Sequence, residues 1–300
     1  MKLTEQKTLQ KTLVPSVISD YFELTKPGIT LLVLASMGIG FLLGSAGAID
    51  YVILFHAVIG TVLIAAGTAA HNQYIERDLD KLMLRTSKRP LPMERISPRS
   101  GLIYSLSLIA AGLIYLIANV NLIAGLVSAA TAISYLAIYT PMKRVNFSNV
   151  IIGAVPGALP PVGGWAAATG TITEPGVWLL FAIVFLWQIP HVVSIAWLCN
   201  DDYTRAGFKM LPAGDASGIK SAWISLICLI SLFPVSFLLF SMGYNSWIFL
   251  TGSILSGLGF LYYGILFLRN RDKRNAKLLM FASIFYLPLI WIFILADVLI

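Results

Sequence analysis

The sequence predicts an all-α membrane protein, a polytopic bundle of nine transmembrane helices with a cytosolic cap of loops. Its 300 residues are 58% hydrophobic and only 12% charged, and the mean hydropathy is +0.83. Soluble domains have roughly 45–50% apolar and about 25% charged residues. The apolar residues also form continuous runs of about 20, long enough to cross a bilayer as helices, unlike the weakly alternating segments of a membrane barrel.

The apolar runs and the breaks between them define the expected elements. The nine runs cover residues 28–46, 50–71, 100–117, 120–139, 148–167, 175–198, 220–242, 245–268 and 277–298. Residues 1–27 are expected to form a cytosolic N-terminal tail, and residues 28–300 a single transmembrane domain. Residues 153–165 of the fifth run contain three prolines and four glycines, which predict a broken helix, close helix packing through glycine, or both.

Positive charge is distributed unevenly along the chain. All 21 Lys and Arg residues lie in the tail or beside the breaks after the second, fourth, sixth and eighth runs. The positive-inside rule makes these loops cytoplasmic, which predicts a multi-pass plasma-membrane protein with its N-terminus inside and its C-terminus outside. The net charge of +7 therefore indicates orientation and contact with membrane lipid, and not nucleic-acid binding.

A polar stretch directly after the second run is the clearest functional signal. Asn72, Glu76 and Asp80 recur every four residues, so they line one face if the helix continues. An amide oxygen and two carboxylates suit Mg²⁺. Cations follow in the same segment: Arg85, Lys88 and Arg89. Because cations suit the phosphates that such a metal bridges, this segment predicts a diphosphate site at the membrane surface.

Two further polar segments flank inner helix ends. Tyr139 and Lys143 follow the fourth run, and Pro141 between them makes a regular helical turn unexpected. Asp201 and Asp202 follow the sixth run and precede further cations. If the two acidic helix ends face one cavity, they can hold one or two Mg²⁺ ions and a diphosphate. A cavity in the membrane would take an isoprenoid tail and keep water from an allylic cation.

In order and spacing, these segments resemble the UbiA superfamily of intramembrane prenyltransferases, and within it the protoheme IX farnesyltransferase, or heme O synthase, branch. The resemblance implies Mg²⁺-assisted transfer of farnesyl from farnesyl diphosphate to a vinyl group of protoheme IX. Water then completes the hydroxyethylfarnesyl substituent. It also implies that the product passes to a heme-modifying enzyme or a terminal oxidase.

The resemblance also implies roles for individual residues. The expected metal ligands are Asn72, Glu76, Asp80, Asp201 and Asp202. The expected substrate-binding residues are Arg85, Lys88, Arg89, Lys143, Arg144, Asn149 and Arg205. The expected catalytic residues are Asn72, Asp80, Tyr139, Lys143, His191 and Asp202. Ala206 stands where relatives often have a further Asp, so the number of metal ions stays open. His191 is expected either to ligate heme iron or to orient a neighbouring group.

Simpler interpretations remain for the same residues. Glu76 and Asp80 could be solvated and paired with nearby cations, and the loop cations could serve only as topology anchors. A second function is prenyl transfer to an aromatic quinone precursor such as 4-hydroxybenzoate. A third is a transporter with an acidic cation relay and a gate in the fifth run, although the charges lie at one face and not at the midplane.

Overall fold

The computed structural model describes residues 16–299, and the regular elements in that range are all helices. Nine helical segments within it are long and apolar enough to cross a bilayer, as predicted. Seven are single helices: α2 (Pro27–Gly44), α3 (Tyr51–Asp80), α4 (Pro98–Asn119), α9 (Pro175–Leu198), α11 (Ile219–Ser241), α12 (Trp247–Arg269) and α13 (Lys273–Leu299). The other two are composite.

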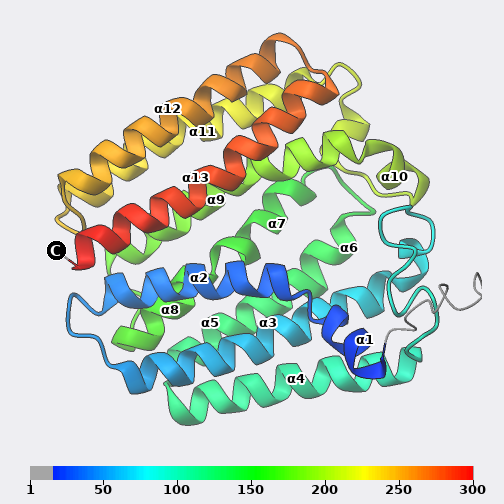
Figure 1. Cartoon of the computed structure of the whole chain (residues 1–300), viewed down its shortest axis with the longest axis horizontal. Helices are drawn as coiled ribbons and strands as arrows, with labels where there is room; N and C mark the ends of the chain where they lie inside the picture. The colour runs from blue at the N-terminus through cyan, green and yellow to red at the C-terminus, as the bar shows by residue number, and fades with distance from the viewer. Residues whose placement is uncertain (1–15, 300) are drawn as a thin grey trace, which may run out of the picture.

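The composite spans are the fourth and the fifth. The fourth consists of α5 (Leu122–Ile133), a π-helix (Ser134–Tyr139) and α6 (Thr140–Met142), and the fifth of α7 (Asn149–Ala158) and α8 (Pro160–Thr169). Two short helices lie at the loop end of the bundle, α1 (Val17–Leu24) and α10 (Asn200–Arg205), and a 3₁₀ turn covers Leu211–Gly214. The C-terminal end of α13 lies at the opposite end (Figure 1).

The spans form two groups with α7 between them (Figure 1). Helices α2 to α5 and α8 pack together on one side, and α9, α11, α12 and α13 pack on the other. Large apolar side chains such as Leu31, Ile114 and Leu255 are exposed on the outside of the bundle. Such an apolar exterior suits contact with lipid.

The fifth span is both broken and tightly packed, so both predictions for its glycines and prolines are confirmed. The break falls at Leu159, and Pro160 opens α8, where the missing N–H costs nothing. Helix α8 then crosses α2 at main-chain contact: a Cβ atom at Gly164 would overlap the carbonyl oxygen of Met37, and one at Gly40 would overlap that of Pro161. Only glycine allows this approach.

Helix α3 is longer than the predicted 50–71 run. Its 30 residues span about 45 Å at 1.5 Å per residue, against about 30 Å of hydrocarbon. The helix therefore carries its polar last turns beyond the apolar layer, toward the loops.

Helix α1 lies within the predicted tail, where no helix was predicted; residues 1–15 of that tail lie outside the described range. Ser16 caps α1 by accepting a hydrogen bond from the Ser19 N–H. Arg95 Nε lies 2.9 Å from Asp20 Oδ1, and Gln73 Nε2 donates to the Leu24 carbonyl at 2.9 Å. These contacts join α1 to α3 and to the loop after it.

Candidate functional site

The predicted polar face of α3 is buried at the loop end of the bundle. Asn72, Glu76 and Asp80 are 1%, 6% and 1% exposed, so the expectation that they share one face of a continued helix is confirmed. The loop after α3 folds back over this face. Arg89 Nη1 lies 2.8 Å from Asp80 Oδ2, and Thr86 Oγ1 donates to the Asp80 carbonyl at 3.0 Å.

Each of these three polar side chains has a cation as a neighbour. Lys26 Nζ donates to Asn72 Oδ1 at 3.2 Å, and Lys143 Nζ lies 2.8 Å from Glu76 Oε1. With Arg89 on Asp80, three cations surround two carboxylates. The excess of positive charge in a buried site is suited to binding an anion such as diphosphate.

Lys26 was not among the predicted site residues, because its position before Pro27 suggested only a helix start and a topology anchor. Its backbone is left-handed, with φ 47° and ψ 64°, a conformation that costs energy in a residue with a side chain. Burial lowers the pKa of Lys26 to about 7, with a further contribution from the nearby Arg89 and Lys143 cations. A strained lysine that exchanges its proton near neutrality is a typical feature of a functional site.

The second acidic segment reaches the loop that covers α3. Asp202 of α10 accepts the main-chain N–H groups of Leu84 and Arg85 at 3.3 and 3.4 Å, and also pairs with Arg205. The Arg85 guanidinium lies over the Tyr203 ring, 4.8 Å from its centroid. Asp202 is therefore joined to the loop that follows Asp80, and the convergence of the two carboxylates over one pocket stays a prediction.

The third predicted segment, which contains Tyr139 and Lys143, lies in the same region. Lys143 Nζ lies 4.6 Å from the Tyr139 ring centroid, and the Lys143 carbonyl accepts the Lys209 N–H at 2.7 Å. Asn149 Nδ2 donates to the Lys209 carbonyl at 2.7 Å. The predicted loops thus bond to one another, and Lys143 also pairs with Glu76 of α3.

The turn between Tyr139 and Lys143 is helical, contrary to expectation. The Lys143 N–H donates to the Tyr139 carbonyl at 3.2 Å. The π-helix ends at Tyr139, so Pro141 falls in the first turn of α6, where a missing N–H is tolerated.

The structure does not assemble every predicted site residue. The Asp201 side chain is 81% exposed, and its Oδ2 lies 3.4 Å from Lys273 Nζ. Asp201 and Asp202 are adjacent on a helix, so their carboxylates point about 100° apart. Lys88 and Arg144 are exposed at the loop end, and His191 bonds to α13. No group of three His, Cys, Asp or Glu side chains within the described range forms a ready metal site. The predicted ligand set is therefore only partly assembled: Asn72, Glu76 and Asp80 share a buried face of α3, whereas Asp201 points away from it and Asp202 bonds to the loop after α3 and to Arg205.

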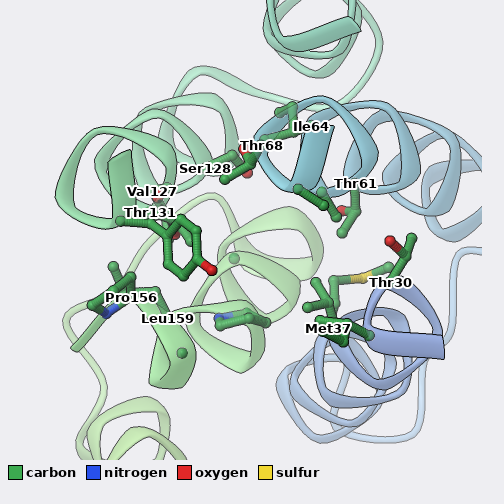
Figure 2. Close-up of a pocket in the computed structure, with 18 of the residues that line it drawn as sticks. Thr30, Met37, Thr61, Ile64, Thr68, Val127, Ser128, Thr131, Pro156 and Leu159 are labelled. Carbon is green, nitrogen blue, oxygen red and sulfur yellow. Dashed lines mark hydrogen bonds between the residues drawn. The ribbon is translucent and has the colours of Figure 1, made fainter. Parts of the chain in front are cut away.

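An apolar cavity of about 190 Å³ adjoins this polar site, with Lys26 in its lining. Its lining residues come from α2, α3, α5 and the α7–α8 break, and Met37, Val127 and Leu159 are among the apolar ones (Figure 2). A row of hydroxyl groups also lines it: Thr30, Thr61, Thr68, Ser128 and Thr131. The sequence pattern had located the polar site but not this cavity, because its residues come from four separate segments.

A buried cluster of cations and carboxylates beside an apolar cavity in a helical membrane bundle suits a protein that binds a lipid with an anionic head group. Residues 31–285 match the UbiA prenyltransferase family, and the chain belongs to that family of prenyltransferases. It is 45% identical to a protoheme IX farnesyltransferase of Solibacter usitatus over 93% of this chain and 98% of that one. It is 39% identical to the protoheme IX farnesyltransferase of Opitutus terrae over 91% and 92%.

Solved structures share the fold, which confirms the predicted fold class. A structure of a UbiA homologue from Archaeoglobus fulgidus bound to GPP and Mg²⁺ has a TM-score of 0.68 at 18% identity, covering 94% of this chain and all of that one. A structure of digeranylgeranylglyceryl phosphate synthase has a TM-score of 0.79 at 17% identity, covering 94% and 98%.

Proposed function

We propose that this prenyltransferase transfers the farnesyl group of farnesyl diphosphate to a vinyl group of protoheme IX and forms hydroxyethylfarnesyl heme. The observation that carries the proposal is the placement of Lys26, which contacts Asn72 of the polar face and also lines the apolar cavity. A diphosphate held by the polar face would therefore have its isoprenoid chain at the cavity entrance. The curated relatives named for this reaction favour heme as the acceptor.

The residues present fit a magnesium ion. Asp80 Oδ1 is buried and has no hydrogen-bond partner within the described range, so its lone pairs are free for a ligand. Mg²⁺ needs only one or two protein carboxylates, because water and substrate phosphates complete its shell. Asp80 and Glu76 would hold it, with Asn72 beside them. When bound, the ion would stabilise the negative charge of the departing diphosphate.

The chain's own side chains then have distinct parts in the transfer. Lys26, Arg89 and Lys143 would bind the diphosphate oxygens. Breaking the allylic C–O bond gives a farnesyl cation and diphosphate, and Tyr139 can stabilise a nearby cation with its ring face. The cation bonds to the terminal vinyl carbon of the heme. Water then adds to the neighbouring carbon and loses a proton.

Product analysis by mass spectrometry tests the proposal. The purified full-length protein in liposomes is given farnesyl diphosphate, Mg²⁺ and either protoheme or 4-hydroxybenzoate. We expect farnesylated heme with one added water, formed only when Mg²⁺ is present. A farnesylated benzoate without farnesylated heme would establish the quinone-precursor alternative. We also propose the orientation with the loop end in the cytoplasm, which protease accessibility of this end in inside-out vesicles would check.

A further inference from the structure

A polar cleft of about 500 Å³ lies at the loop end of the bundle, beside the buried polar face of α3. Its walls come from α1, the first turn of α2, Gln73 of α3 and the loop after α3. Gln73 Nε2 fixes α1 against α3, because it donates to the Leu24 carbonyl at 2.9 Å. At about 30 Å³ per molecule, the cleft has room for on the order of 15 waters. A hydrated ion therefore fits.

Two side chains form the boundary between this cleft and the buried polar face. Lys26 and Arg89 both line the cleft. The same two cations contact the polar face, Lys26 at Asn72 over 3.2 Å and Arg89 at Asp80 over 2.8 Å. The Arg89 side chain is 25% exposed, whereas that of Asp80 is 1% exposed. An anion that moves away from Asp80 in this direction would therefore pass between two cations before it reached water.

The main chain adds positive charge to the same cleft. Helix α2 begins at Pro27, and both Pro27 and Gly28 line the cleft, so the positive end of the dipole of this 18-residue helix lies there. The Gly28 N–H has no hydrogen-bond partner within residues 16–299. Glu23 also lines the cleft, but its carboxylate is paired with Arg95 at 3.3 Å. The cleft as a whole is thus suited to an anion.

The buried polar face needs such a path to water. Asn72, Glu76 and Asp80 are each less than 10% exposed, and a free diphosphate ion cannot leave through hydrocarbon. We infer that the cleft is the outlet through which free diphosphate leaves the polar face, passing between Lys26 and Arg89; the inference rests on the diphosphate site of the proposed function. Farnesyl diphosphate carries the same head group on a chain that stays in apolar surroundings, so only the free product needs a wholly polar path.

Gly28 allows the cleft to be filled without a change in its cations. A Cβ atom there would meet no atom within 4 Å. Purified full-length protein in detergent micelles is loaded with Mg²⁺ and labelled inorganic diphosphate, and release of the label is followed after unlabelled diphosphate is added. A blocked path slows entry and exit alike, so Gly28→Trp should lower both rates at least about tenfold and change the Kd less than about twofold.

Two variants are matched controls for Gly28→Trp. Gly28→Ala leaves the cleft open, and Gly259→Trp places the same ring on the exposed side of α12, where a Cβ would also meet no atom within 4 Å. Both should exchange diphosphate at the wild-type rate, and thermal unfolding compares the stability of all three variants. Wild-type exchange in a folded Gly28→Trp would overturn the inference. A raised Kd with an unchanged association rate would also overturn it, because that result indicates a lost contact and not a blocked path.

Ser19 allows a second test that adds no bulk at the start of α2. Ser19 is exposed on α1 and lines the cleft. The added carboxylate of Ser19→Glu should slow diphosphate association about two- to fivefold at low salt, and the difference should vanish in about 0.5 M NaCl, because salt screens exposed charges. An association rate that stays at the wild-type value at low salt would contradict passage through the cleft.

Turnover experiments separate the two sources of the diphosphate group. With farnesyl diphosphate, Mg²⁺ and protoheme, Gly28→Trp should complete its first turnover at the wild-type rate and then slow, because the product leaves late. A first turnover slowed as much as the release of free diphosphate would overturn the assignment of the cleft to the free product. Slow exchange of inorganic diphosphate in Gly28→Trp, with no farnesylated heme from the wild-type protein, would support the inference and refute the heme reaction alone.

Discussion

The ion pair between Glu76 and Lys143 allows the structural and chemical roles of the site to be separated. Both side chains are largely buried, at 8% and 12% exposure, and their charged atoms are 2.8 Å apart. At an effective dielectric constant of about 20, this distance gives a gross attraction of about 6 kcal/mol, most of which offsets the loss of hydration. Removing one partner leaves the other charge buried and alone.

We expect Glu76→Gln or Lys143→Met alone to lower the free energy of unfolding by about 3–5 kcal/mol. The double variant should regain most of that loss, because neither charge then remains unpaired. The coupling energy is the sum of the two single losses minus the loss in the double variant, so it should be at least about 4 kcal/mol if the double variant loses no more than about 2 kcal/mol. Equilibrium unfolding of the purified proteins in mixed detergent and SDS micelles measures all four members of the cycle.

Farnesyl transfer should respond differently from stability. The double variant lacks a metal-binding carboxylate and a diphosphate-binding cation, so its turnover should stay at least about 100-fold below wild type even where its stability recovers. Additive losses of stability in the double variant would show that the two charges do not interact. Recovery of turnover together with stability would show that the pair is only structural.

Three further predictions concern single positions. Asp80→Asn should lower turnover at least about 100-fold. Asp201→Asn should change turnover less than about twofold, because Asp201 belongs to an exposed ion pair. Steady-state kinetics at saturating Mg²⁺ compares the two variants. Because the pKa of Lys26 is about 7, the cation is lost as the pH rises, so the KM for farnesyl diphosphate should increase between pH 7 and 9 by up to about tenfold per pH unit. Lys26→Met should have a high KM that does not vary over this range. Gly164→Ala should destabilise the protein by about 1–3 kcal/mol, because its methyl group would overlap the Met37 carbonyl, and thermal unfolding in detergent measures the loss.

Each of these three predictions has a control variant or a result that would contradict it. If Asp201→Asn were as inactive as Asp80→Asn, α10 would have to rotate in the working enzyme. A KM that rises equally with pH in Lys26→Met would assign the titration to another group. Gly163→Ala is the matched control for Gly164→Ala, because a Cβ there would have only an ordinary contact of 3.8 Å with Val127; an equal loss in both variants would exclude the α2–α8 contact as the cause.

The sequence predicted the nine spans and the polar face of α3 because both depend on local pattern. Apolar runs define spans regardless of tertiary structure, and a four-residue repeat such as Asn72, Glu76 and Asp80 stays on one face of any helix. The break in the fifth span followed likewise from Pro160 and its neighbouring glycines.

The features that the sequence did not predict depend on tertiary packing or on local geometry. Lys26 is 46 residues from Asn72 in the chain, and only the packed bundle brings the two together. Asp201 and Asp202 are equivalent by composition, but the orientation of α10 turns only Asp202 toward the loop after α3. The helix at Val17–Leu24 was not predicted because Asp20 and Glu23 made this stretch polar, and the structure pairs both carboxylates with the distant Arg95.

The position of the polar site at the cavity mouth has a consequence for the direction of the reaction. Released diphosphate can dissolve in the aqueous phase, whereas a farnesylated porphyrin stays in the lipid phase. The two products thus partition into different solvents and seldom meet again in one binding site. Phase separation at the membrane boundary would thereby oppose the reverse reaction, with no lid or second enzyme needed to remove the products.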